Sequence, residues 1–169
     1  MTDYEFNDKA MQNLISEDER IDLENATNEF RKELGTMDLQ KYMNNIFAEG
    51  TLDKIDEDTE IEFTDDDKKE LRKIQTGEAG VLSISCKVAV KLLKKYRKSI
   101  VAKLKKIPKV GPKLGGWFDK KFGSIVKFLE TAKGGAQSAL KKIFKKLGLS
   151  NENADILADA VLTILSLFI

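Results

Sequence analysis

The chain has 169 residues, of which 41% are apolar and 34% are charged, so it can bury a core and keep a strongly charged surface. It contains no histidine and a single cysteine, which excludes histidine-based catalytic triads, histidine-ligated zinc and a disulfide within the chain. The formal net charge is only +1, but charge is distributed very unevenly along the sequence.

The two halves of the chain carry opposite charge. Residues 1–75 contain 22 acidic and 10 basic residues, a net charge of −12, whereas residues 76–169 contain 6 acidic and 19 basic residues, a net charge of +13. Such asymmetry is typical of an acidic segment that covers a basic one, or of a partner with negative charge. We therefore expect an acidic region over residues 1–75, a linker over 76–80 and a basic domain over 81–169.

Neither end of the chain carries a recognisable membrane or secretion signal. The first twenty residues are acidic and lack the apolar core of a signal peptide. Two interpretations stay open: a secreted protein whose signal is not present in this chain, or a cytoplasmic one. The apolar segment 154–169 contains aspartates, and its sixteen residues would span roughly 24 Å as a helix, less than a bilayer core of about 30 Å. We expect no autonomous transmembrane helix there.

The acidic region is predicted to be mostly helical. Ser16, with Glu19 three positions later, forms a capping-box pattern for a helix that ends at Gly35. A second short helix follows within residues 37–50, and Thr64 is the expected N-cap of a third over 65–75. The apolar stripes of the first two helices are Ile21, Leu23, Phe30 and Leu34, and then Leu39, Tyr42, Met43 and Ile46.

The acidic run at residues 56–67 raises the question of a strand and of a calcium site. Residues 58–64 alternate apolar and polar side chains, which predicts a short strand. The run lacks the central glycine of a calcium-binding loop, so we expect a solvated charged face and no metal site.

A short segment of small residues separates the two halves: Thr76, Gly77, Glu78, Ala79 and Gly80. Its two glycines mark a break between a charged helix and an apolar run. It is either an ordinary loop or an exposed linker at which a protease cuts the chain.

The basic region has a helical period from Val81 onward. Its first helix is expected to continue to Pro108, followed by a connecting turn over 109–116 and two further basic helices over 117–133 and 136–148, the last ending at Gly148. The stripe of the first helix is Ile84, Val88, Leu92, Tyr96, Ile100, Leu104 and Ile107. Cys86 lies among apolar residues and is read as a buried small hydrophobe, a dimer linker or an unused thiol.

The final helix, capped by Ser150, is apolar on almost every side and therefore needs burial against several neighbours. The expected fold class is mainly α. An acidic helical region would pack on a bundle of basic amphipathic helices with the apolar C-terminal helix buried inside.

The sequence gives no support for an enzyme or a cofactor. It lacks a phosphate-binding loop and a nucleophile elbow, and nothing distinguishes one carboxylate pair for acid–base chemistry. A lysine-coated surface fits either nucleic acid or anionic lipid. The basic half has 18 lysines but one arginine, and its aromatic residues lie on the apolar stripes, which favours a membrane partner over nucleic acid.

The basic half resembles the helical, lysine-rich bacteriocins of Gram-positive bacteria that are made with an acidic pro-region, of the enterocin and streptococcin type. The similar stretches are KLLKKYRKSIVAKLKKIPKVGPKLGG (residues 91–116), Trp117, and ALKKIFKKLGLSNENADILADAVLTILSLFI (residues 139–169). Some of these proteins carry a cysteine pair, whereas this chain has Cys86 alone.

The resemblance implies a secreted antimicrobial precursor. A processing protease would cut within 76–80, and the released cationic domain would act on anionic bacterial membranes. The residues expected to attract headgroups are Lys94, Lys95, Lys98, Lys105 and Lys106, and those expected to insert are Trp117, Phe118, Phe122 and Phe144. The alternative is a nucleic-acid-binding or protein-interaction helical module with an autoinhibitory acidic segment.

Overall fold

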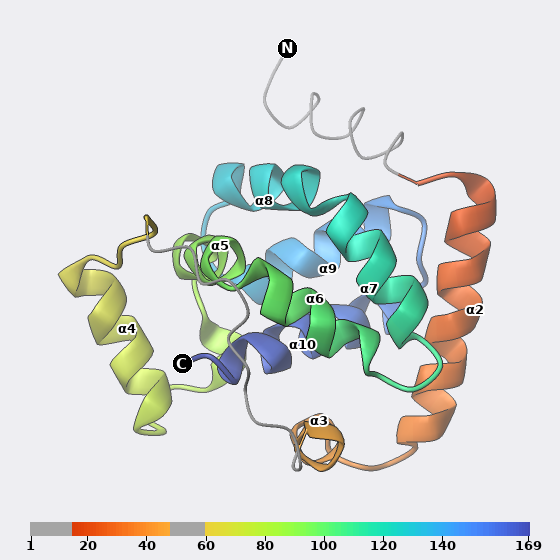
Figure 1. The fold of residues 1–169 in the computed structure, drawn as a ribbon, viewed down its shortest axis with the longest axis horizontal. Coiled ribbons are helices and arrows are strands. Elements are labelled where there is room, and N and C mark those ends of the chain that lie inside the picture. The colour runs from red at the N-terminus through yellow and green to blue at the C-terminus, as the bar shows by residue number, and fades with distance from the viewer. Residues whose placement is uncertain (1–14, 48–59) are drawn as a thin grey trace.

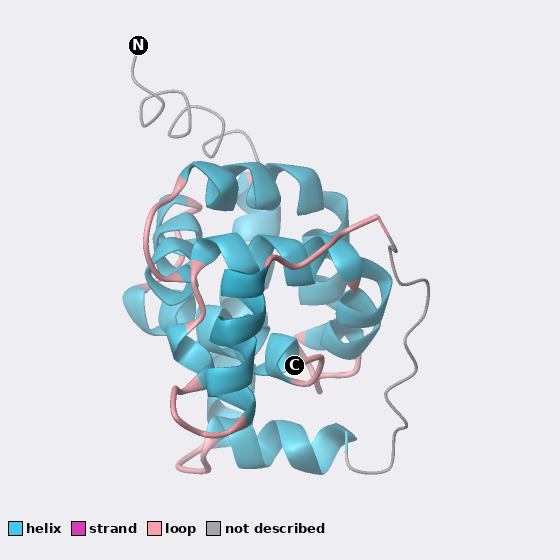
Figure 2. Cartoon of the chain, turned by 90° about the vertical axis from the view of Figure 1, so that its left-hand side faces the viewer, coloured by secondary structure: helices cyan, strands magenta, loops and turns pink. Residues whose placement is uncertain are grey.

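The computed structural model describes residues 15–47 and 60–169. Within these residues the fold consists of α-helices and one 3-10 turn, without strands, which confirms the mainly α prediction (Figures 1 and 2). The elements are α2 (Glu17–Leu34), α3 (Leu39–Phe47), α4 (Asp65–Gln75), η1 (Val81–Ser83), α5 (Cys86–Lys95), α6 (Arg97–Lys105), α7 (Gly111–Lys120), α8 (Phe122–Thr131), α9 (Ala136–Lys146) and α10 (Asn151–Ser166).

The last helix, α10, crosses the middle of the molecule and is surrounded by the others (Figure 1). Ten of its sixteen residues are buried, and it contacts α2, α3, α5, α6 and α9. Because α10 is apolar on nearly every side, burial against several helices removes most of its apolar surface from water. The core of the molecule is therefore built around α10.

The three described helices of the acidic half lie on the outside of this core. In Figure 1, α2 runs along one side, α4 lies on the opposite side and α3 lies below. Leu23 and Phe30 of α2 and Met43 and Phe47 of α3 are all buried in the common core. Ile21, which the sequence places on the same stripe, is 44% exposed, so that prediction is wrong: the residue lies on the outer face of α2.

The predicted N-caps of this half are correct. Ser16 and Thr64 form capping boxes with Glu19 and Asp67, and α2 ends at Gly35 as expected. The strand predicted over 58–64 is absent from its described part, because residues 60–64 have no neighbouring strand to pair with and Thr64 caps α4 instead. Residues 58–59 and the expected end of the second helix at Gly50 lie outside the described residues.

The long helices predicted in the basic half are each divided in two. Residues 81–85 form a 3-10 turn and a loop, and Ser85 caps α5 by accepting a hydrogen bond from the Val88 amide at 3.2 Å. Tyr96, with φ −117° and ψ 26°, separates α5 from α6, and Lys121 separates α7 from α8 in the same way. These breaks turn the shorter helices so that each one lays its apolar face on the core.

The turn predicted over 109–116 is also shorter than expected, because α7 begins at Gly111. The glycines of this segment permit close packing rather than a turn. A Cβ at Gly111 would lie 2.5 Å from the carbonyl oxygen of Lys105, and one at Gly115 would lie 2.4 Å from Lys105 Cγ. Helices α6 and α7 therefore pack as a tight pair that larger side chains would separate.

Two predictions near the C-terminus are confirmed. Ser150 caps α10 by accepting a hydrogen bond from the Asn153 amide, and α9 is followed by Gly148 with φ +97°. Cys86, in the basic half, is buried, which agrees with the first of its three interpretations, and this burial raises the pKa of its thiol.

Candidate functional site

The lysines that the sequence predicts as headgroup contacts lie on α5, α6 and the residue that follows α6. Lys94, Lys98, Lys105 and Lys106 are exposed, whereas Lys95 is partly buried. Lys94 is paired with Glu130 at 3.0 Å, and the Lys95 ammonium lies 5.4 Å from the ring centroid of Phe63. The structure thus keeps four of the five accessible to solvent.

The aromatic residues predicted to insert into lipid are all buried in this conformation. Trp117 and Phe122 are 6% exposed, and Phe118 and Phe144 are fully buried. The ring centroids of Trp117 and Phe144 are 5.8 Å apart, and those of Phe118 and Phe122 are 6.0 Å apart. Insertion of these side chains would require the helices to separate.

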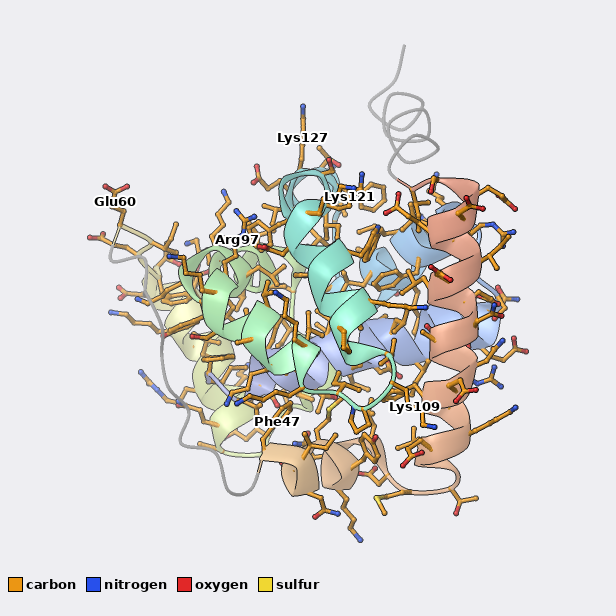
Figure 3. The ribbon with its side chains drawn as sticks, turned by 45° about the vertical axis from the view of Figure 1, so that its right-hand side comes forward. Phe47, Glu60, Arg97, Lys109, Lys121 and Lys127 are labelled. Carbon is orange, nitrogen blue, oxygen red and sulfur yellow. The ribbon has the colours of Figure 1, made fainter. Side chains whose placement is uncertain are left out.

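The acidic helix α2 meets the basic half along a contact that we call the α2–α7 edge, defined by two ion pairs. Asp22 pairs with Lys113 at 3.5 Å, and Glu29 pairs with Lys109 at 3.4 Å. Figure 3 places Lys109 on the loop between α6 and α7, beside α2. Each of the four side chains is more than half exposed, so each pair is screened by water and is worth about 1 kcal/mol or less.

The electrostatic field of α7 also reaches the first turn of α2. A hydrogen bond from the Ser16 backbone lowers the pKa of Glu19; burial opposes this shift, and the charges of Lys120 and Lys121 add to it. Glu19, Asp22 and Glu29 of α2 therefore face lysines of α7 and of the residues next to it.

The space along the α2–α7 edge is not closely packed. A hollow of about 190 Å³ between α2 and α7 is lined by residues that include Asp22, Leu23, Lys113, Trp117 and Lys120. The indole nitrogen of Trp117 is buried without a hydrogen-bond partner among the described residues. A second hollow of about 420 Å³ lies between α2 and the lysines 109 and 113. A larger hollow of about 650 Å³ lies on the other side of α2, where Arg31 and Lys32 face Glu152 and Asp155 of α10, so hollows border both sides of the helix.

The opposite edge of α2 is held by hydrogen bonds to the turn between α9 and α10. The Glu24 carboxylate accepts a hydrogen bond from the Ser150 amide at 3.2 Å. The side-chain amide of Asn153, which is fully buried, donates to the Glu24 carbonyl at 3.3 Å and to Asn28 Oδ1 at 2.8 Å, and its oxygen accepts from Arg31 at 3.2 Å. We call this set of contacts the α2–α10 edge.

A separate contact joins α4 to α5 through a buried carboxylate. Asp67 is 2% exposed, accepts hydrogen bonds from the Thr64 amide and from Lys91 Nζ, and lies 3.6 Å from Lys87 Nζ. Burial alone would raise the pKa of Asp67, but the hydrogen bonds from Lys91 and Thr64 and the charge of Lys91 lower it to about 2. The Glu70 carboxylate accepts hydrogen bonds from the amide and the hydroxyl of Ser85.

The five predicted linker residues form an irregular connection between α4 and η1. Thr76, Gly77, Glu78 and Gly80 are exposed and Ala79 is partly buried, and Gly77 has φ +83°. A protease can reach such a segment, although exposure alone does not make it a cleavage site.

Two further properties hold for the described residues. They contain no group of three or more Asp, Glu, Cys or His side chains placed to hold a metal ion. None of the described helices is both long enough and apolar enough to cross a bilayer.

Sequence reasoning identified the charge division but not the residues that pair across it. Asp22 and Glu29 are seven positions apart, a spacing that puts both on one face of a helix, and this signal was available. Their partners Lys109 and Lys113 are remote in sequence and stand among many similar lysines, so the pairing required the fold.

Comparison of the chain with protein-family models, with curated proteins and with solved structures gave no match. The function of this chain must therefore be inferred from its own geometry and charge.

Proposed function

We propose that this chain is an antimicrobial, bacteriocin-like precursor. Its cationic helical region, residues 81–169, would act on anionic bacterial membranes after the acidic region has separated from it. The acidic region would act as an intramolecular partner that keeps the cationic region folded and inactive. In this proposal the protein works outside the cell.

The observation that supports the proposal most directly is that carboxylates of the acidic half are paired with lysines of the basic half. Asp22, Glu29 and Asp67 contact Lys113, Lys109 and Lys91 respectively. Many further lysines of the basic half are exposed, and in Figure 3 Lys127 extends away from α8. Each lysine near an anionic bilayer contributes on the order of 1 kcal/mol to binding, so a few suffice to hold the protein there.

The apolar faces of the basic helices would supply the second part of the activity. In the folded chain α5, α6 and α9 pack against α10, α7 and α8 pack against these helices, and residues of α2 and α3 join the same core. Separation of α2 and α3 would expose apolar surface next to lysines, which is the composition of helices that lie in a membrane interface.

The proposal is tested by cutting the intact chain between its two halves. A recognition sequence for a specific protease replaces residues 77–80, and leakage of a dye is measured from vesicles of phosphatidylglycerol and from neutral phosphatidylcholine vesicles. We expect the cut chain to release dye from the anionic vesicles only. The unaltered chain, treated with the same protease, is the control.

Two results would contradict the proposal. One is intact anionic vesicles in the presence of the cut chain. The other is tight binding of the cut chain to duplex DNA with a steep dependence on salt and without leakage, which would favour the nucleic-acid-binding alternative.

A further inference from the structure

The α2–α7 edge has the geometry of an occupied binding site for anions. Asp22 and Glu29 are two helical turns apart, which separates their carboxylates by roughly 10 Å along α2. Each one meets a lysine, Lys113 or Lys109, and Lys120 lines the same hollow as Asp22 and Lys113. The carboxylates of Asp22 and Glu29 therefore lie beside a row of three lysines.

We infer that Lys109, Lys113 and Lys120 form the first lipid-headgroup site of the protein, and that α2 occupies this site as an internal competitor. These lysines differ from the exposed ones on α5 and α6 that the sequence indicates. The inference rests on the proposed function and specifies which surface meets the membrane first.

The chemistry of the site favours a lipid surface over a small anion. Its cations are lysines on exposed stems, which attract by charge without the fixed fork geometry of arginine. More than half of the Lys109 and Lys113 side chains is accessible, so nothing encloses a single phosphate. A flat array of separate headgroup charges can replace both carboxylates of α2 at once.

The two edges of α2 differ in a way that lets one side separate first. Hollows border both edges, but the polar contacts of the α2–α7 edge are exposed ion pairs, which are weak and easily exchanged for others. The α2–α10 edge has the buried Asn153 network, whose disruption would leave polar groups unpaired. An anionic surface that competes at α7 would therefore tilt α2 outward about its α2–α10 edge and uncover Trp117.

The test uses the intact chain and vesicles of equal parts phosphatidylglycerol and phosphatidylcholine. Asp22→Asn with Glu29→Asn removes the competing charges, and we expect vesicle binding, measured by co-sedimentation, to become several-fold tighter. Lys109→Ala with Lys113→Ala, made in this background, is expected to weaken binding roughly 30-fold, from about 1 kcal/mol for each lysine. Lys109→Arg with Lys113→Arg keeps the charge and is expected to retain binding.

A matched control separates the site from the overall charge. Asp65→Asn with Asp66→Asn removes two exposed carboxylates from α4, which lies on the opposite side of the molecule from α2. Equal tightening by the two carboxylate pairs, or an unchanged affinity after loss of both lysines, would overturn the inference.

The single tryptophan reports the movement of α2, because Trp117 lies in the hollow beneath that helix. We expect its emission to change when anionic vesicles are added, and to change less in the lysine variant. The same change with inorganic phosphate at equal ionic strength would indicate a small-anion site and overturn the assignment to lipid. Lysine-dependent binding without dye leakage from the cut chain would instead uphold the site and refute the proposed function.

Discussion

The buried carboxylate of Asp67 is expected to make the stability of the fold depend on pH. Its pKa is about 2 in the folded chain, below the ordinary value of 3.8. A carboxyl group whose folded pKa is lowered stabilises the fold fully above its unfolded pKa, and this stabilisation is lost as the pH falls through the folded value. The relevant window is therefore about pH 4 down to pH 2.

We predict that Asp67→Asn lowers the free energy of unfolding at pH 7 by about 2 kcal/mol, because Lys91 loses its charged partner. The same change should flatten the loss of stability between pH 4 and pH 2. Denaturant unfolding at a series of pH values measures both effects. Asp66→Asn, an exposed neighbour in the same helical turn, is the control, and an equal loss in both variants would refute the role of the buried carboxylate.

Asn153 offers a second residue-scale prediction, at the α2–α10 edge. Its side chain is fully buried and bonded to Glu24, Asn28 and Arg31. Asn153→Ala removes the partly buried hydrogen bonds to the Glu24 carbonyl and Asn28, so we expect a loss of about 2 kcal/mol in unfolding free energy. Limited proteolysis should then cut α2 earlier. Asn151→Ala, exposed at the start of the same helix, should change neither measurement by much.

At the scale of helices, the glycines of α7 determine how closely it approaches α6. A methyl group at Gly111 would meet the backbone of Lys105, which cannot move aside as a side chain can. We predict that Gly111→Ala lowers the free energy of unfolding by about 1–3 kcal/mol through overpacking. Thermal or denaturant unfolding measures this change.

Gly116 provides the matched control in the same helix, because a Cβ there would meet nothing within 4 Å. Gly116→Ala should stabilise the fold by about 0.5–1 kcal/mol, since alanine is the better helix former. Opposite signs at positions 111 and 116 would establish close packing as the reason for glycine; the same sign at both would refute it.

The starts of helices could be predicted from sequence because their signals are local. Ser16, Thr64 and Ser150 each use a side chain within four residues of the amide that they cap. The breaks at Tyr96 and Lys121 fall on residues that are neither glycine nor proline, and each lets the two short helices pack against different neighbours: α7 packs on α6 and α2, whereas α8 packs on α5 and α9. The turn predicted over 109–116 is wrong from residue 111 onward, because glycine marks both turns and close contacts between helices. The ion pairs of the candidate site join residues about 80 or more positions apart, so charge alone indicated a contact but not its members.

For the whole molecule, the decisive comparison is between the apolar and the ionic contacts that join the two halves. Leu23, Phe30, Met43 and Phe47 are buried in the common core, and each fully buried side chain contributes about 1.5–3 kcal/mol. The exposed pairs at Lys109 and Lys113 contribute at most about 1 kcal/mol each. Apolar burial therefore dominates the association.

It follows that cutting the linker is not enough to separate the halves. We predict that a chain cut within residues 77–80 still elutes as one complex in size-exclusion chromatography, even in 1 M sodium chloride, where exposed charges are screened within about 3 Å. Anionic vesicles should separate the two fragments, because they compete for the lysines and accept the uncovered apolar faces, whereas neutral vesicles should not. Elution as two separate fragments in salt alone would mean that charge, and not apolar burial, holds the acidic half in place.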